Sequence, residues 1–144
     1  MASPKADRVQ VNKSSRTLTL FAQGEVLRQF RIALGPKPKG HKKQEGVERT
    51  PEGDYVLDFK NSDSDFYKSI RISYPNGNDK RQANDRGVEP GGAIMIHGLP
   101  NNLDMSPSLV QMYNWTDGCI AVTNDEMDII WAAVDEGTPI EILP

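Results

Sequence analysis

The stretch TLTLFAQGEVLRQFRIAL, residues 17–34, decides the fold class. Residues 17–21 alternate between apolar and polar, which is the pattern of a β-strand with one buried face. The strand-like run 26–34 follows after Gln23 and Gly24. A two-residue gap of this kind is typical of a tight β-hairpin, because glycine takes the positive φ that the turn needs. The sequence therefore predicts an antiparallel pair of strands.

The rest of the chain continues this pattern. Six further short, apolar-rich segments are predicted as strands: residues 9–12, 54–59, 68–73, 93–97, 120–122 and 138–143. Residues 35–53 and 75–92 are rich in glycine, proline and charge, and both are predicted as loops. The expected fold is mostly β, with about eight short strands and one or two helices.

One helix is predicted over residues 123–137. Thr123 suits the N-cap, and Glu126 three positions later completes a capping-box pattern. Apolar side chains recur at the spacing of one helix face, so Trp131 is expected in the core, and Gly137 is the expected stop. The face consists of Met127, Ile130, Trp131 and Val134.

Length and charge limit the function classes. The 144 residues are expected to form one domain, residues 1–144. A net charge of −3 argues against a nucleic-acid partner. The cations in residues 35–43 are interpreted as a solvated loop or as a contact for an acidic polymer. No apolar run approaches the roughly 18 residues of a membrane span, and no signal peptide is visible, although a leader before residue 1 could have been removed.

The single cysteine and one of the two histidines suggest a reactive pair. Cys119 follows a turn and precedes the predicted strand 120–122, whereas His97 ends the predicted strand 93–97. If the two strands are neighbours, His97 can take the thiol proton and lower the pKa of Cys119. Main-chain N–H groups near Gly118 could form an oxyanion hole. A buried structural cysteine is the competing interpretation, and zinc would need more ligands than this pair offers.

Two separated motifs support the catalytic interpretation. IHG, residues 96–98, and TDGCI, residues 116–120, together resemble the signature of the L,D-transpeptidase (YkuD-type) catalytic domain. That signature is a histidine, a loop, then Ser or Thr, any residue, Gly, Cys and an apolar residue. GVERTPEGDY, residues 46–55, is similar to the family's upstream TPxGxY segment. The resemblance spans most of the chain.

The resemblance implies a β-sandwich-like fold with a loop flap over the active site, and peptidoglycan as the substrate. In this family the cysteine attacks the carbonyl of the third stem-peptide residue, diaminopimelate in many bacteria, and D-alanine leaves. An amine from another stem then takes the acyl group, which gives a 3→3 cross-link. Other members attach a lipoprotein, use water or cleave such links. A hydrolase (an L,D-carboxypeptidase or an amidase releasing peptidoglycan-linked protein) and a non-catalytic wall-binding module therefore stay open.

By position, the resemblance assigns the roles of the site residues. Cys119 is the nucleophile, His97 is the base, and the Gly98 carbonyl orients the imidazole. The N–H groups of Gly118 and Cys119 form the oxyanion hole. The resemblance also implies stem peptides or an outer-membrane lipoprotein as partners and carbapenem β-lactams as inhibitors. It further implies the periplasm or cell envelope as the location, and neither a metal nor an organic cofactor.

Some positions depart from the family pattern or support weaker predictions. Asp117 stands where many members have a second histidine, and it is expected to point away from the sulfur. Ala121 stands where others have Asn or Arg, which puts the donor contacts in doubt. The Thr116 hydroxyl is predicted to support the cysteine turn, and Trp115 to shape the acceptor side. Lower in rank, Arg71 and Tyr74 are predicted to recognise a substrate carboxylate or line the cleft; a surface arginine and a packed tyrosine are the alternatives.

Overall fold

The computed structural model describes residues 4–36, 38–101, 106–107, 111 and 115–144. Strands dominate this part of the chain, as predicted. They are β1 (Arg8–Asn12), β2 (Thr17–Ala22), β3 (Glu25–Arg31), β4 (Gly53–Ser64), β5 (Tyr67–Ile72), β6 (Met95–His97), β7 (Ile120–Ala121) and β8 (Thr138–Leu143). The helices are α1 (Gly77–Asp85) and α3 (Asn124–Ala133). None of the described helices is long and apolar enough to cross a membrane.

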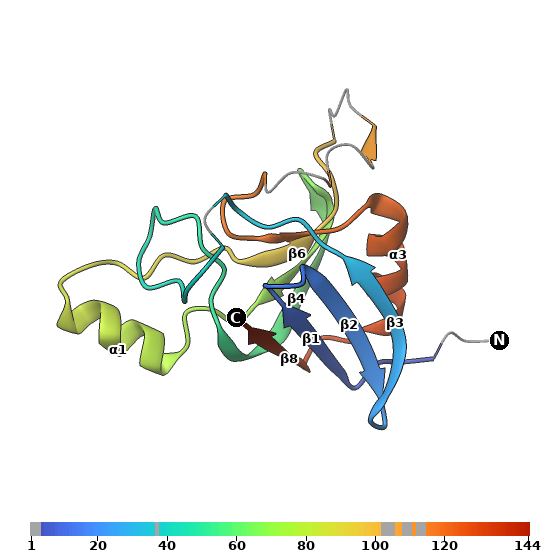
Figure 1. Ribbon diagram of the computed structural model, residues 1–144, viewed down its shortest axis with the longest axis horizontal. Helices are drawn as coiled ribbons and strands as arrows, with labels where there is room; N and C mark the ends of the chain where they lie inside the picture. Colours follow the sequence, from blue (N-terminus) through green and yellow to red (C-terminus); the bar gives the residue numbers. More distant parts are fainter. Residues whose placement is uncertain (1–3, 37, 102–105, 108–110, 112–114) are drawn as a thin grey trace.

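The strands form one curled sheet in the order β3-β2-β1-β8-β4-β5-β6-β7 (Figure 1). β8 joins two halves, because it pairs parallel with β1 and antiparallel with β4. Beyond β3, Ala33 exchanges two backbone hydrogen bonds of 2.9 and 3.0 Å with Ala121 in β7. The two edges of the sheet therefore meet, which gives the sandwich-like shape that was expected.

The β2–β3 hairpin has the turn that the sequence predicts. Gln23 and Gly24 both have positive φ, +53° and +79°. Positive φ at both central residues defines a type I′ turn, whose twist matches that of the paired strands. Because side chains alternate along a strand, the hairpin buries Leu18, Leu20 and Phe30 in the core.

Helix α3 has the predicted start but ends earlier than expected. The Thr123 hydroxyl accepts the Glu126 N–H and the Glu126 carboxylate accepts the Thr123 N–H, so both halves of the capping box form. The helix ends at Ala133, because Val134 is already extended, with φ −114° and ψ 128°. Trp131 is only partly buried: it packs against the core, with the Lys60 Nζ 5.0 Å from its ring centroid.

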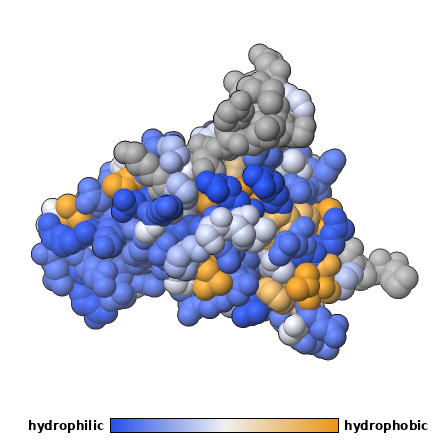
Figure 2. All heavy atoms as spheres, in the orientation of Figure 1, coloured by the Kyte–Doolittle hydropathy of each residue, from blue (hydrophilic) through white to orange (hydrophobic). Residues whose placement is uncertain are grey.

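Helix α1 corrects the prediction of a loop over residues 75–92. Asn76 is its N-cap. The Asn76 side chain accepts the Asp79 N–H and the Asp79 carboxylate accepts the Asn76 N–H, so a capping box starts this helix as well. Within the helix only Asp79 and Ala83 are buried. The end of the molecule that carries α1 is almost uniformly hydrophilic in Figure 2. With no apolar face, the segment has no helical hydrophobic period to detect.

Candidate active site

The sheet places the predicted pair side by side. β6 and β7 are neighbouring parallel strands, with Ile96 opposite Ile120 and His97 opposite Ala121. Continued by one residue, this register sets Cys119 level with Met95. Because side chains alternate along a strand, Cys119 and His97 project from the same face of the sheet. The neighbouring strands that the sequence argument required are therefore present.

Both residues line one cleft of about 470 Å³, together with Phe66, Trp115 and Asp117. The cleft floor is the β6–β7 edge, and one wall is the turn between β4 and β5. His97 is buried, with 3% of its surface exposed, whereas Cys119 is half-buried. The arrangement gives a thiol and an imidazole access to the same small volume.

His97 has a defined tautomer. Its Nδ1 lies 2.7 Å from the carbonyl oxygen of Gly98. A carbonyl can only accept, so Nδ1 carries the hydrogen and Nε2 keeps its lone pair. Burial lowers the pKa of His97, so the ring stays neutral near pH 7 and can accept a proton. This contact has the geometry that the resemblance implied for Gly98.

Phe66 is a site residue that the sequence analysis missed. Its ring stacks on His97, with centroids 4.4 Å apart and planes 26° from parallel, and the Trp115 ring lies 5.6 Å from His97. The Phe66 carbonyl also accepts the Gly98 N–H at 2.9 Å. The tip of the β4–β5 hairpin thus supports the imidazole directly and through Gly98.

Gly98 fits only as glycine. A Cβ at this position would lie 2.6 Å from Asn124 Oδ1 and 3.0 Å from the Phe66 carbonyl oxygen. Asn124 Oδ1 is already engaged, because it accepts the Leu99 N–H at 2.9 Å. Two other segments therefore pack against Gly98, and any side chain would displace the carbonyl that orients His97.

The turn before Cys119 is held by internal and external bonds. The Thr116 hydroxyl donates to the Cys119 carbonyl at 2.7 Å and accepts the Gly118 N–H at 3.3 Å. From outside the turn, Thr50 donates to the Gly118 carbonyl at 2.6 Å. Gly118 has φ +114°, and a Cβ there would lie 2.7 Å from the Arg49 carbonyl oxygen. The upstream TPEG motif therefore packs against the cysteine turn.

The charge state of Cys119 differs from the sequence expectation. Burial raises its pKa, and the Asp117 charge raises it further, while a Met95 backbone hydrogen bond and Lys42 lower it. Asp117 was expected to point away, but it lines the cleft. The prediction that His97 lowers this pKa is therefore wrong for the resting protein, in which the neutral thiol donates to the Ala93 carbonyl at 3.4 Å and shares the cleft with a neutral imidazole.

Arg71 and Tyr74 do not line this cleft. Arg71 is exposed, and its Nε forms an ion pair with Asp58 at 2.8 Å. Tyr74 is buried, and its hydroxyl donates to the Pro90 carbonyl at 2.7 Å. Burial, followed by the nearby Asp79 charge, raises the pKa of Tyr74 to about 12, so this hydroxyl stays protonated. Among the described residues, no group of three or more His, Cys, Asp or Glu could hold a metal ion.

Comparison with known proteins agrees with this geometry. The model of the L,D-transpeptidase catalytic domain, YkuD, matches residues 6–142. The chain belongs to this family. A curated relative, the candidate L,D-transpeptidase YafK of Escherichia coli, is 30% identical over 132 residues, which cover 88% of this chain and 46% of YafK.

Solved structures match almost the whole of this chain. Pgp2, a helical cell shape determining protein of Campylobacter jejuni, is 26% identical with a TM-score of 0.72, over 99% of this chain and 49% of Pgp2. An L,D-transpeptidase solved in complex with imipenem shares the fold, with a TM-score of 0.58 at 20% identity over 94% of this chain and 58% of that one. The chain thus spans about half the length of YafK and Pgp2.

Proposed function

We propose that this L,D-transpeptidase domain is a cysteine acyl-transferase acting on peptidoglycan stem tetrapeptides. The observation that supports it best is the placement of His97 and Cys119 on one face of adjacent strands, with the His97 lone pair free to meet the thiol. A nucleophile beside an oriented base is the arrangement that acyl transfer requires. The chain spans about half the length of YafK and Pgp2, so the identity of the acceptor is also a proposal.

The first half of the reaction forms a thioester. His97 Nε2 takes the proton of Cys119 as the sulfur attacks the carbonyl carbon of the third stem residue. Because the resting pair is neutral, His97 removes this proton during attack, as a general base. The main-chain N–H groups of Cys119 and Gly118 stabilise the oxyanion, and the Gly118 N–H then exchanges its 3.3 Å bond to Thr116 for one to the substrate. The protonated His97 gives its proton to the nitrogen of the departing D-alanine.

The second half passes the acyl group to an amine. The acceptor nitrogen attacks the thioester carbonyl and loses a proton to His97, and the sulfur leaves as a thiolate that recovers that proton. A side-chain amine of another stem gives a cross-link, and the amine of a lipoprotein gives attachment. We place this chemistry in the cell envelope, where peptidoglycan lies. Carbapenems are expected to acylate Cys119, since they present a strained acyl group to the same nucleophile.

Mass spectrometry of tetrapeptide muropeptides incubated with the domain tests this proposal, with Cys119→Ala as the matched control. Cross-linked dimers that form with the wild type and vanish in the variant are the expected result. D-alanine release without dimers would replace the amine acceptor with water and make the domain a hydrolase. If neither product forms while imipenem still adds its mass to Cys119, the tetrapeptide is the wrong substrate.

A further inference from the structure

A second hollow of about 280 Å³ lies next to the cleft that holds His97 and Cys119. The two hollows share Gly92 and Asp117 in their linings, so they are neighbours. The other walls of the second hollow come from Lys42, from residues 45–48 and from Gly91. Lys42 is the one lysine or arginine among the described residues that line either hollow.

Lys42 is a buried cation whose ammonium group does not use all of its N–H donors within the described part of the chain. Only 4% of its surface is exposed, and its Nζ donates one hydrogen bond, to the Val47 carbonyl at 3.2 Å. Within the described part of the chain no ion pair joins it to a carboxylate. Burial lowers the pKa of Lys42, while the nearby Cys119 and Glu45 charges raise it. An ammonium group without a counter-ion is costly to bury, and a carboxylate ligand would offset that cost.

The two loops that form this hollow are fastened to each other. The Glu45 N–H donates to the Glu89 carbonyl at 2.7 Å, and Arg86 Nη2 donates to the Lys43 carbonyl at 2.8 Å. Each bond joins the Lys42 loop to the segment that follows α1. The hollow is therefore a preformed part of the fold.

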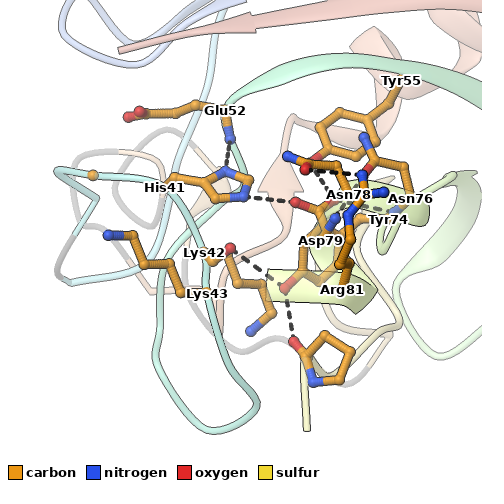
Figure 3. A network of polar contacts seen from close by, with 12 residues as sticks. His41, Lys42, Lys43, Glu52, Tyr55, Tyr74, Asn76, Asn78, Asp79 and Arg81 are labelled. Atoms are coloured by element: carbon orange, nitrogen blue, oxygen red, sulfur yellow. Dashed lines mark hydrogen bonds and ion pairs between the residues drawn. The ribbon is translucent and has the colours of Figure 1, made fainter. Parts of the chain in front are cut away.

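The residues next to Lys42 are held as firmly. Figure 3 shows His41 between two partners: the Glu52 N–H donates to its Nδ1 at 2.7 Å, and its Nε2 lies 2.8 Å from Asp79. On the other side, the Tyr74 hydroxyl lies 3.4 Å from the Lys42 carbonyl oxygen. The backbone that carries Lys42 is thus set before any ligand arrives, which limits the entropy lost on binding.

We propose that Lys42 binds a carboxylate on the acyl part of the substrate, the part that stays on Cys119. This inference rests on the proposed function. His97 must protonate the departing amine, so the leaving residue lies at the His97 end of the cleft. The retained residue then extends past Asp117 toward Lys42.

The charges of the second hollow suit one kind of side chain. Among the described residues Lys42 is its one cation, and three exposed acidic residues, Glu45, Glu48 and Asp117, also line it. The side chain of diaminopimelate ends in a carbon that bears both a carboxylate and an ammonium. Lys42 matches the carboxylate, and the three acidic residues match the ammonium. A lysine at the third stem position would lack the group that Lys42 binds.

Rates of D-alanine release from three tetrapeptides test the proposal. The first carries free diaminopimelate, the second the same residue with its side-chain carboxylate amidated, and the third a free diaminopimelate but an amidated terminal D-alanine. The wild type should prefer the first over the second by about 10- to 100-fold in kcat/KM, the value of a charge-assisted hydrogen bond. Lys42→Met should abolish this preference, and Lys42→Arg should keep most of it.

Lys43→Met is the matched control, because Lys43 is exposed in the same loop and its side chain lines neither hollow. It should keep the full preference. Each preference is a ratio within one variant, so partial unfolding of Lys42→Met does not distort it. The proposal is overturned if Lys42→Met keeps the preference for the free side-chain carboxylate. It is also overturned if the preference that the variant loses is for the terminal carboxylate.

Equilibrium binding separates this proposal from the proposed function. Calorimetry with the Cys119→Ala protein and the tripeptide product, free or amidated at diaminopimelate, involves no chemistry. The free tripeptide should bind about 10- to 100-fold more tightly, and the Cys119→Ala, Lys42→Met double variant should lose the difference. This result without D-alanine release in the rate assay would keep the subsite and reject the reaction. Equal binding of both tripeptides would reject the subsite.

Discussion

The two histidines of this chain have opposite surroundings. His41 has both ring nitrogens engaged, one by the Glu52 N–H and the other by the buried Asp79 carboxylate (Figure 3). His97 has one nitrogen bonded to the Gly98 carbonyl, and no described residue bonds to the other, which is free to meet the thiol in the cleft. A histidine can act as a base only through a free lone pair. The number of ring nitrogens that are already hydrogen-bonded therefore separates a structural histidine from one that can react.

Exchanging each histidine for glutamine should give the largest contrast. His97→Gln removes the base and should lower the rate of D-alanine release about 10²- to 10⁴-fold. His41→Gln should slow the reaction far less, but should lower the free energy of unfolding by about 1–3 kcal/mol, because it loses a bond to a buried carboxylate. Steady-state rates and thermal denaturation of both variants measure this. Equal losses of rate would break the distinction.

A smaller effect is expected where the cleft histidine meets Phe66. The ring of Phe66 shields His97 from water, and this burial lowers the pKa of His97. Phe66→Leu should therefore raise that pKa toward its ordinary value. Protonated His97 cannot act as a base, so the acid limb of the rate–pH profile should move to higher pH. At acidic pH we expect a loss of roughly two- to tenfold, the range of one aromatic contact.

Phe66→Tyr is the control for this measurement, since it keeps the stacked ring. It should leave the acid limb in place. Proton NMR titration of the His97 ring can follow the same shift without substrate. An unchanged His97 pKa in Phe66→Leu would mean that the sheet alone keeps this imidazole dry.

The smallest effect is expected at Asp117. Its charge raises the pKa of Cys119, so Asp117→Asn should lower it, and the thiol should titrate at lower pH. Asp117 is exposed, so added salt should shrink the difference between variant and wild type. Titration of Cys119 reactivity against pH at two salt concentrations measures both effects. Asp58→Asn, an exposed change away from the cleft, should leave the titration unmoved.

Local patterns predicted much of the fold. The β2–β3 hairpin and the start of α3 follow from Gln23–Gly24 and from Thr123 with Glu126, because turns and caps are decided by residues close in the chain. Helix α1 was missed because its stability comes from a capping box and from the buried Asp79, and not from an apolar stripe. A search for hydrophobic periodicity cannot detect a helix that is stabilised in this way.

The site was predictable to the same extent. The motifs around His97 and Cys119 pointed to two residues that share one cleft, but not to the state of their protons, which depends on how deeply the fold buries each group. Phe66 carries no motif and reaches His97 only through the β4–β5 turn. Lys42 lay in a segment whose cations looked like a solvated loop, yet it is buried and shares the lining of its hollow with Gly91 and Gly92, about fifty positions away. Such long-range contacts are invisible in a single sequence.

The position of β8 has a consequence for how the protein is made. Residues 138–143 lie in the middle of the sheet, between β1 and β4, although the ribosome delivers them after all the other strands. Until then only the Ala33–Ala121 bridge can join β1–β3 to β4–β7, and β1 and β4 have open edges, which invite pairing with other chains. Assembly of this sheet therefore waits for synthesis to reach β8, and the nascent chain needs protection for that interval.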